Sequence, residues 1–423
     1  MEGTARQIPF RVMKKYIIYS FIYLFFTSVA YSKTIVVSEK GSIKSVKTAL
    51  KIAGSGDTIL VAKGIYRESG IVIDKRIILK GRPGACLVSS AKEDMITVKT
   101  DSVFITGLII QNVPVSYTTE YAAIKLANTR GCIITGNMLF NNFFGIYLSR
   151  SSLCRVSKNI IIGTNTEEAS SGNAIHLWDS DYNIIEYNIL SGHRDGIYLE
   201  FVNNCIIEYN YSQSNIRYGL HFMYSDTNFY YKNIFNRNGA GVAVMYSRYI
   251  IMAANIFVNN QSVNSYGLLL KEIFDSELFG NTIRNNTYGI FAEGITRIKI
   301  EGNDIESNGW AMKILGSCTD NIIRRNNFEG NSFDITTNAS ASANVFVENY
   351  WDRYTGYDLD GDNIGDIPYR PVKLFSFITA KAQESLVLIN SVFVDLLNFG
   401  ESISPVLTPK TLSDPKPMMN RIL

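Results

Sequence analysis

The sequence predicts an all-β protein, a right-handed parallel β-helix of about eleven coils with an N-terminal cap and a C-terminal helical tail. A unit of about 22 residues recurs over most of the chain, its short runs are rich in Ile, Val, Phe and Tyr, and an asparagine follows each start at a constant distance. The starts are small or polar residues: Ala123, Gly145, Ala174, Gly196, Gly219, Gly241, Gly267, Gly289, Ala311 and Asp334.

The asparagines follow these starts by 14 residues in the first eight units and by 15 in the last two. They are Asn137, Asn159, Asn188, Asn210, Asn233, Asn255, Asn281, Asn303, Asn326 and Asn349. Asparagine tolerates left-handed backbone geometry, and its amide can hydrogen-bond to the coils on both sides. We therefore expect an amide ladder along one corner of the β-helix.

Alternation within each unit assigns a face to each side chain. The first and third residues after the start are apolar in almost every unit, as in Ile197 and Leu199, so these side chains should point inward. The second and fourth should point outward. This pattern places His221 and Met223 on the exterior of one coil and Met245 on the exterior of the next.

The segments on either side of the repeats complete the organisation. Residues 1–32 are predicted to be an export signal, because Lys14 and Lys15 precede an apolar run too short to span a bilayer comfortably. An uncleaved anchor is the alternative. The remaining segments are 33–93, an N-terminal cap with the first coils; 94–349, the β-helix repeats; 350–376, an exit segment with an acidic loop; and 377–423, a C-terminal helix and proline-rich tail.

The charge balance argues against one class of partner. The chain has 41 basic and 38 acidic residues, and residues 1–32 hold four of the basic and one of the acidic ones. The exported protein would therefore be neutral. A neutral chain disfavours nucleic-acid binding driven by bulk charge, so no nucleic acid is expected as a partner.

The five cysteines have two interpretations. Cys132 and Cys154 occupy equivalent positions in neighbouring units, and Cys205 has the same position two units later. Small inward-facing core residues are the favoured interpretation, and a disulfide or a thiolate metal site is the alternative.

Two units are longer than the others, with 29 residues before Ala174 and 26 before Gly267. The extra residues lie around Thr164–Ser171 and Gln261–Ser265, so both loops should emerge from the same corner. Loops on a rigid scaffold often carry binding residues, but insertions without a role are equally common.

A copper site is predicted on the outward face between these loops. The ligands are His221, Met223 and Met245, with His176 as a further candidate. Thioether and imidazole groups suit the soft ion Cu(I) and poorly suit Ca²⁺ or Mg²⁺. The alternative is a hydrophobic contact patch in which the histidines are incidental.

A calcium site is predicted in the acidic loop of the exit segment. Asp358, Asp360, Asp362 and Asp366 match positions 1, 3, 5 and 9 of a calcium-binding loop. The bidentate glutamate expected at position 12 is replaced by Tyr369. A solvated acidic turn is the alternative.

A carbohydrate enzyme must also be considered, because many β-helices bind or cleave polysaccharides. Such an enzyme needs paired carboxylates. The candidates are Asp179, Asp181, Asp195 and Glu200, but the motifs of pectinases are otherwise missing. We therefore expect no enzymatic activity.

Several long segments resemble the NosD family, the periplasmic maturation factors of nitrous oxide reductase. The similar segments are Arg194–Glu200, Arg217–Asp226, Asn238–Arg248, Tyr266–Lys271, Asn308–Ala311, Asn349–Asp352 and Pro368–Val372, with Leu407–Pro409 in the tail. The similarity covers nearly the whole exported chain, although its N-terminal third is less distinctive.

The resemblance implies a role in copper-centre assembly. Its partners would be an ABC transporter, consisting of a permease and an ATPase, a copper-chaperone lipoprotein and nitrous oxide reductase itself. The protein would be periplasmic and associated with an inner-membrane complex, and it would receive or relay Cu(I) transiently. The alternatives are a polysaccharide-binding or polysaccharide-cleaving β-helix and an assembly scaffold that binds no metal.

Overall fold

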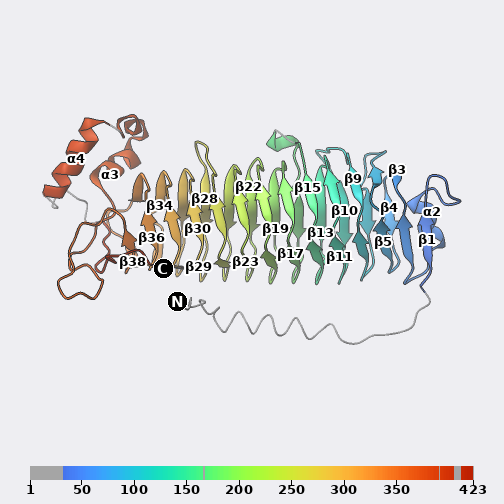
Figure 1. The fold of residues 1–423 in the computed structure, drawn as a ribbon, viewed down its shortest axis with the longest axis horizontal. Helices are drawn as coiled ribbons and strands as arrows, with labels where there is room; N and C mark the ends of the chain where they lie inside the picture. Colours follow the sequence, from blue (N-terminus) through green and yellow to red (C-terminus); the bar gives the residue numbers. More distant parts are fainter. Residues whose placement is uncertain (1–31, 165–166, 390, 404–410, 423) are drawn as a thin grey trace.

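The structure is a computed structural model that describes residues 32–164, 167–389, 391–403 and 411–422. The predicted export signal lies outside these residues, apart from Ser32. The described chain forms a long rod with a small helix at one end and two longer helices at the other (Figure 1). The rod is a parallel β-helix built from three sheets, which confirms the predicted fold class.

Each complete coil contributes one strand to each sheet, and the strands pair in parallel with those of the neighbouring coils. Strand β1 precedes the first complete coil, and β38 and β39 follow the last one. Sheet A contains β1 (Thr34–Val37), β2 (Thr58–Val61), β5 (Ile78–Gly81), β8 (Phe104–Thr106), β11 (Ile133–Thr135), β14 (Arg155–Ser157), β17 (Ile184–Glu186), β20 (Ile206–Glu208), β23 (Phe229–Tyr231), β26 (Ile251–Ala253), β29 (Glu277–Phe279), β32 (Lys299–Glu301), β35 (Thr319–Arg324) and β38 (Ala343–Val347).

Sheet B contains β3 (Gly64–Arg67), β6 (Ala85–Val88), β9 (Ile109–Gln111), β12 (Met138–Phe140), β15 (Ile160–Ile162), β18 (Ile189–Ser191), β21 (Tyr211–Gln213), β24 (Ile234–Asn236), β27 (Ile256–Val258), β30 (Thr282–Arg284), β33 (Asp304–Glu306), β36 (Asn327–Glu329) and β39 (Tyr350–Trp351). Sheet C contains β4 (Ile71–Ile73), β7 (Ile96–Val98), β10 (Ala122–Ala127), β13 (Phe144–Ser149), β16 (Ile175–Trp178), β19 (Asp195–Glu200), β22 (Tyr218–Met223), β25 (Ala240–Met245), β28 (Tyr266–Lys271), β31 (Tyr288–Glu293), β34 (Trp310–Ile314) and β37 (Phe333–Thr336).

The rod has more coils than the sequence predicts. Sheet A has 14 strands among the described residues, against about eleven predicted coils. The difference arises mainly because residues 33–93 already contain β1 to β6, two coils before the regular repeat begins. The helix α2 (Val46–Ile52) covers the first coil, burying Val46, Ala49 and Leu50. Ser45 caps this helix by accepting a hydrogen bond from the Thr48 N–H.

The predicted asparagine column is a continuous hydrogen-bonded ladder between sheets A and B. The amide of Asn233 shows the pattern: its Oδ1 accepts from the Asn210 N–H at 2.9 Å, and its Nδ2 donates to Asn255 Oδ1 at 3.0 Å and to the Ile207 carbonyl at 2.9 Å. The left-handed residue is the one before each ladder asparagine, for example Tyr209 and Lys232, rather than the asparagine itself.

A second ladder, which the sequence analysis missed, follows the corner between sheets B and C. Its asparagines are Asn215, Asn238, Asn260, Asn286, Asn308 and Asn331. The two long loops leave the rod at this same corner, between β15 and β16 and between β27 and β28 (Figure 1). The first loop carries the short 3-10 helix η2 (Glu168–Ser170).

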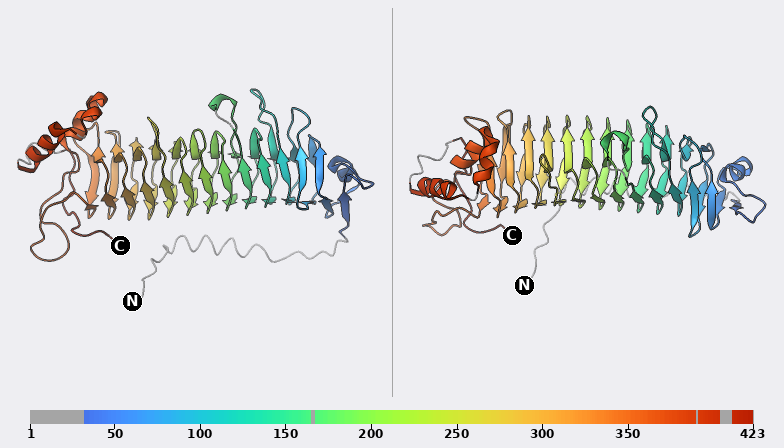
Figure 2. Two further views of the ribbon diagram at one scale, coloured as in Figure 1. Left: turned by 45° about the horizontal axis from the view of Figure 1, so that its top comes forward. Right: turned by 90° about the horizontal axis from the view of Figure 1, so that it is seen from above.

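The C-terminal end of the rod is covered by a helical tail (Figure 2). In place of one helical segment over 377–399, the structure has α3 (Leu374–Lys381), the 3-10 helix η3 (Gln383–Leu388) and α4 (Val392–Ile403). Phe375 and Val394 pack against Phe333 of β37. No helix in the described part of the chain is both long and apolar enough to cross a membrane.

The Asn233→Ala variant should unfold at lower denaturant concentration than the wild type, because the Asn210 N–H and the Ile207 carbonyl would lose buried partners. Each unsatisfied buried group costs about 1–3 kcal/mol, so we expect a loss of about 3 kcal/mol in the free energy of unfolding. Asn264→Ala, in the exposed loop before β28, is the matched control and should be neutral. Equal midpoints for the two variants would contradict a stabilising ladder.

Candidate metal-binding face

The outward side chains of sheet C form straight columns, because the strands pair without a shift in register. Met223 of β22 lies directly opposite Met245 of β25, and His221 lies two residues before Met223 on the same face. Adjacent strands are about 4.8 Å apart, and alternate residues of one strand are about 6.8 Å apart, so side chains of this length from the three positions can approach one another. The column that contains His221 continues with Tyr198 on one side and Ala243 on the other.

The four predicted copper ligands differ in exposure. Met223 and Met245 are partly exposed, as expected for exterior side chains. His221 and His176 lie on the outer face of the sheet, but only 3% and 4% of each residue is exposed. Aromatic rings cover His221: the ring centroids of Tyr198 and Tyr218 both lie 4.8 Å from its imidazole. The rings around it, rather than the strand itself, bury this histidine.

An ion pair between the buried Asp195 and the partly exposed Arg217 lies at one edge of the His221 ring. Arg217 donates hydrogen bonds through Nε and Nη2 to the two oxygens of Asp195, at 3.1 and 2.8 Å. His221 Nδ1 lies 3.3 Å from Arg217 Nη2 and 3.5 Å from Asp195 Oδ2. Burial alone would raise the pKa of Asp195, but the hydrogen bonds from His221 and Arg217 outweigh burial and lower it. Asp195 is therefore an ionised carboxylate beside the imidazole.

The other ring nitrogen of His221 is available to a ligand. Its Nε2 is buried and has no hydrogen-bond partner among the described residues. His221 Nδ1 faces both the Arg217 guanidinium and the Asp195 carboxylate, and in the tautomer that donates Nδ1–H to Asp195 the Nε2 atom keeps its lone pair for a metal, an arrangement common in metal-binding histidines. The free Nε2 and the two thioethers form a soft donor set that suits Cu(I) better than a hard cation.

His176 is not brought next to the methionines. It lies on β16, two strands from β22, and Tyr198 stands between it and His221 in the column. At about 4.8 Å per strand, the two imidazoles are roughly 10 Å apart, so one ion cannot contact both rings. His176 stacks on Tyr147 with 4.6 Å between ring centroids, and neither of its nitrogens has a hydrogen-bond partner in the described chain.

The third histidine has a structural position. The N–H of His193 donates to Asn215 Oδ1 at 3.2 Å, so this residue occupies an asparagine position of the second ladder. It is completely buried at the corner and does not lie on the outer face of sheet C. The sequence carries a signal for this position, because His193 follows Asn188 of the main ladder by five residues, just as Asn215 follows Asn210.

The first long loop reaches the candidate site. Glu168 of η2 forms an ion pair with Arg217 Nη1 at 3.2 Å. The loop is thereby linked, through Arg217, to Asp195 and His221. On the other side of the methionines, a surface hollow of about 640 Å³ is lined by residues that include Tyr224, Tyr246 and Arg248.

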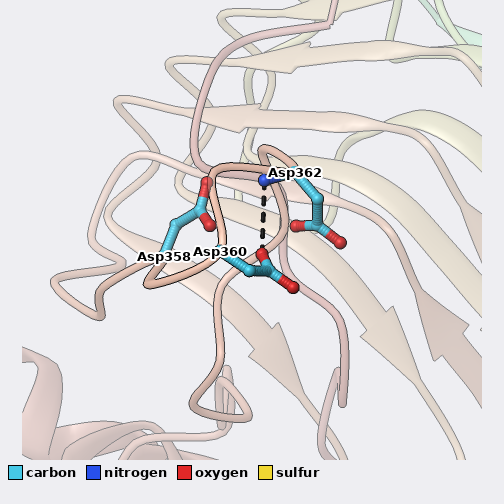
Figure 3. A group of neighbouring side chains, drawn as sticks. All are labelled: Asp358, Asp360 and Asp362. Carbon is cyan, nitrogen blue, oxygen red and sulfur yellow. Dashed lines mark hydrogen bonds between the residues drawn. The ribbon is translucent and has the colours of Figure 1, made fainter.

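The acidic loop brings three of its four carboxylates together (Figure 3). One oxygen from each of Asp358, Asp360 and Asp362 can be chosen so that all three lie within 4.8 Å of one another. Asp366 instead accepts a hydrogen bond from the Leu359 N–H at 2.8 Å. The C-terminal tail contacts the same loop, because the Met419 N–H donates to the Asn363 carbonyl at 3.0 Å.

Among the carboxylates considered for a carbohydrate enzyme, Asp195 and Glu200 are poorly placed as a pair, whereas Asp179 and Glu200 lie on neighbouring coils, with the Asp179 N–H donating to the Glu200 carbonyl at 3.0 Å. Asp195 is fully buried in its ion pair, and Glu200 lies five residues further along the same strand. Five residues of a strand span about 17 Å, whereas glycosidase carboxylates lie roughly 5–9.5 Å apart. Asp181 accepts a hydrogen bond from the Asn203 N–H and so has a structural partner.

Comparison with known proteins identifies a family of copper proteins. The sequence model of the family described as periplasmic copper-binding protein (NosD) matches residues 50–200 and 163–360. A NosD of Pseudomonas aeruginosa, named as an ABC transporter binding protein, is 28% identical over 88% of this chain and 90% of its own length. The similarly named NosD of Stutzerimonas stutzeri is 30% identical, but the match covers only 24% of each chain.

Solved structures share the fold at low sequence identity. The Dettilon tailspike protein has a TM-score of 0.59 at 14% identity, covering 73% of this chain and 69% of the tailspike chain. The family 28 exopolygalacturonase of Yersinia enterocolitica has a TM-score of 0.58 at 10% identity, covering 75% and 79%. At these identities the likeness concerns the β-helix architecture alone.

The two unpartnered histidines should make the metal-free protein sensitive to acid. Burial is the main cause that lowers the pKa of His176 to about 3 and that of His193 to about 4, whereas an unfolded histidine titrates near 6.5. The unfolded state therefore binds more protons below about pH 6.5. Each histidine should then lower the free energy of unfolding by about 1.4 kcal/mol per pH unit, until the pH reaches its folded pKa.

Denaturant titrations between pH 7.5 and about 4.5 would test this. The His176→Phe variant keeps a flat ring against Tyr147 and should show a shallower loss of stability with acid than the wild type. Parallel pH profiles for the two proteins would contradict a neutral, buried His176.

Proposed function

Because the chain belongs to the NosD family of periplasmic copper-binding proteins, we propose that it is an exported accessory protein in the maturation of nitrous oxide reductase. In this proposal it receives or relays Cu(I) for copper-centre assembly and catalyses no reaction of its own. One observation carries the proposal: Met223 and Met245 pair in register on the same outer face as His221, whose Nε2 has no hydrogen-bond partner among the described residues.

The donor set fits a relay better than a storage site. Thioethers bind Cu(I) selectively without the strength of thiolates, and both methionines are partly exposed. An incoming carrier protein could therefore reach the ion while it is still bound. The Asp195–Arg217 pair would hold the imidazole in place during this exchange. His176 would act at most as a second, separate site, since Tyr198 separates it from His221.

The helical tail offers a surface for the transporter. On α4 the side chains of Val392, Phe393 and Leu396 are exposed by 73%, 51% and 63%, while Val394 on the opposite face packs against the rod. An exposed apolar helix face is typical of a protein or membrane interaction site. Since relatives are named as ABC transporter binding proteins, we propose that α4 docks on the permease of the transporter, with the ATPase on its far side.

Two further partners follow from the proposed role. A copper-chaperone lipoprotein would deliver the ion, and nitrous oxide reductase would accept it. The competing function is a scaffold that holds these proteins together and binds no copper. It is favoured only if Met223 and Met245 bind no metal. A polysaccharide-binding or polysaccharide-cleaving role draws on the fold alone.

The acidic loop is proposed to bind Ca²⁺ as a structural ion. Asp358, Asp360 and Asp362 supply three hard oxygen ligands, and the backbone N–H groups of Gly361 and Asn363 already hold Asp358. Burial would raise the pKa of Asp358, but these backbone hydrogen bonds outweigh it and lower the pKa, so the carboxylate is ionised at neutral pH.

Cu(I) affinity is the direct test of the relay. In anaerobic competition titrations with a chromogenic Cu(I) chelator, the Met223→Ala/Met245→Ala variant should lose at least tenfold in affinity, because two of three donors are removed. Met138→Ala, an exposed methionine on β12, is the matched control and should bind like the wild type. Equal affinity for both variants would remove the proposed site.

The same variant separates the relay from the scaffold in cells. A relay predicts nitrous oxide reductase with reduced copper content when the double variant replaces the wild type. A scaffold predicts full copper content, provided that the variant accumulates to the wild-type level.

Transporter docking should depend on the apolar face of α4. Leu396→Glu places a charge on that face and should abolish co-purification with the transporter, while the thermal midpoint of the isolated protein stays unchanged. Val263→Glu is the matched control, since Val263 is 82% exposed in the loop before β28. Retained co-purification of the α4 variant would show that the transporter binds elsewhere.

Calcium should stabilise the exit segment and the tail that contacts it. Addition of Ca²⁺ should raise the thermal midpoint and slow proteolysis after residue 353 in the wild type, but not in Asp358→Asn/Asp360→Asn. Mg²⁺ at the same concentration is the control ion, because it requires a stricter octahedral geometry. If Ca²⁺ changed the thermal midpoint and the proteolysis rate of the wild type and the variant equally, the calcium site would be rejected and the loop would be a solvated acidic turn.

A further inference from the structure

Two of the five cysteines lie side by side on neighbouring coils. Cys132 precedes β11 and Cys154 precedes β14, which pair with Ile133 opposite Arg155. On the other side, Arg130 pairs with Ser152. Hydrogen bonds close both flanks: the Gly131 N–H donates to the Ser152 carbonyl at 3.0 Å, and the Arg155 N–H donates to the Cys132 carbonyl at 2.9 Å. The two cysteines are therefore held opposite each other.

This spacing is compatible with a covalent bond. Neighbouring strands are about 4.8 Å apart, and the Cα atoms of a disulfide are usually about 4.4–6.8 Å apart. The nearness of the two thiols is the main influence on the pKa of both, lowering that of Cys132 and raising that of Cys154. As free thiols, Cys132 donates to the Thr100 carbonyl at 3.6 Å and Cys154 donates to the Ser152 carbonyl at 3.3 Å. Both side chains are buried in the rod, with 0% and 1% of each residue exposed.

No other pair among the cysteines has this arrangement. Cys205 belongs to the same column but is separated from Cys154 by Asn183, whose N–H donates to Cys205 Sγ at 3.2 Å. Cys86 lies on β6 in sheet B, and the Cys318 thiol donates to the Ala292 carbonyl at 3.4 Å. The five cysteines therefore comprise one adjacent pair and three separate thiols.

At other coils, the column that contains Cys132 and Cys154 holds asparagine side chains that hydrogen-bond one coil to the next. Asn183 Oδ1 accepts the Cys154 N–H at 2.8 Å, and Asn228 Oδ1 accepts the Cys205 N–H at 2.8 Å. Each amide connects one coil to the coil before it. Between the coils of Cys132 and Cys154, two thiols stand where an asparagine would otherwise hydrogen-bond one coil to the next. A disulfide between them would connect these two coils instead.

We propose that Cys132 and Cys154 form an intramolecular disulfide that joins the two coils in the exported protein. The family is periplasmic, and the periplasm is an oxidising compartment in which paired cysteines are commonly oxidised. This inference depends on export alone and not on the proposed copper site.

The oxidant would be a thiol–disulfide exchange protein of the periplasm. The thiolate of one cysteine attacks the disulfide of the oxidised carrier, and one carrier sulfur leaves as a thiolate. The second cysteine then attacks the mixed disulfide and releases the carrier as a dithiol. The chain loses two electrons and two protons, and the carrier gains them.

Burial fixes the timing of this reaction. A carrier protein cannot reach two thiols that are enclosed in the finished rod, so the bond must form on the exported chain before these coils close. After folding, the same burial protects the disulfide from reductants. Because the bond closes a short loop of one coil, it restricts the unfolded chain in the N-terminal half of the β-helix.

Peptide mapping of the periplasmic protein tests the proposal. Free thiols are alkylated in denaturant without reductant, and the chain is digested with trypsin. Cleavage at Arg130, Arg150 and Arg155 places Cys132 in Gly131–Arg150 and Cys154 in Ser151–Arg155. We expect these two peptides as one cross-linked species that separates on reduction, while Cys86, Cys205 and Cys318 are alkylated.

Variants provide the controls. Cys205→Ser should keep the cross-linked species, and Cys132→Ser should lose it. Reduction of the denatured wild type before refolding should lower its thermal midpoint, while the Cys132→Ala/Cys154→Ala variant should not respond to the same treatment. Alkylation of both cysteines in the wild type, or a cross-link of either to Cys205, would overturn the proposal, and the wild-type map gives this answer even if a variant fails to fold.

Discussion

The structure depends on stacking of one coil on the next without a shift in register. A single coil has three short strands and cannot bury its apolar side chains alone, so each coil is stable only when its neighbours are in place. The buried asparagine ladders impose the register, because each amide bonds to the coils before and after it. The main ladder ends on Asp414 of the returning tail, whose Oδ2 accepts from Asn349 N, Asn349 Nδ2 and Trp351 Nε1 at 3.0, 3.0 and 3.1 Å.

Register also creates the candidate metal site. A residue type that recurs at one position of the unit appears as a neighbour in space, and this is how Met223 meets Met245. The Asp195–Arg217 pair also joins neighbouring coils, because Asp195 of β19 lies opposite Tyr218 and Arg217 directly precedes β22. The site therefore needs no specialised loop, although Glu168 of the first long loop contacts Arg217.

The repeat period explains what the sequence could predict. It gave the fold class, the asparagine column and the shared face of His221, Met223 and Met245. It could not give the burial of His221, which depends on the rings of Tyr198 and Tyr218. It placed the first coils within residues 33–93 but could not count them, because their units lack the regular asparagine, and it merged α3 and α4 into one helix because both carry apolar residues at helical spacing. Side-chain packing between columns and breaks between helices are not periodic.

The distribution of sulfur in the rod suggests how copper would be kept at the surface. Thiolates bind Cu(I) more strongly than thioethers, so an accessible cysteine pair would compete with Met223 and Met245 for the ion. In this chain Cys132 and Cys154 are enclosed in the rod, whereas both methionines are partly exposed. A disulfide between the cysteines would remove their affinity for Cu(I) altogether. The weaker, reachable donors would then be the ones that hold the ion, as a relay requires.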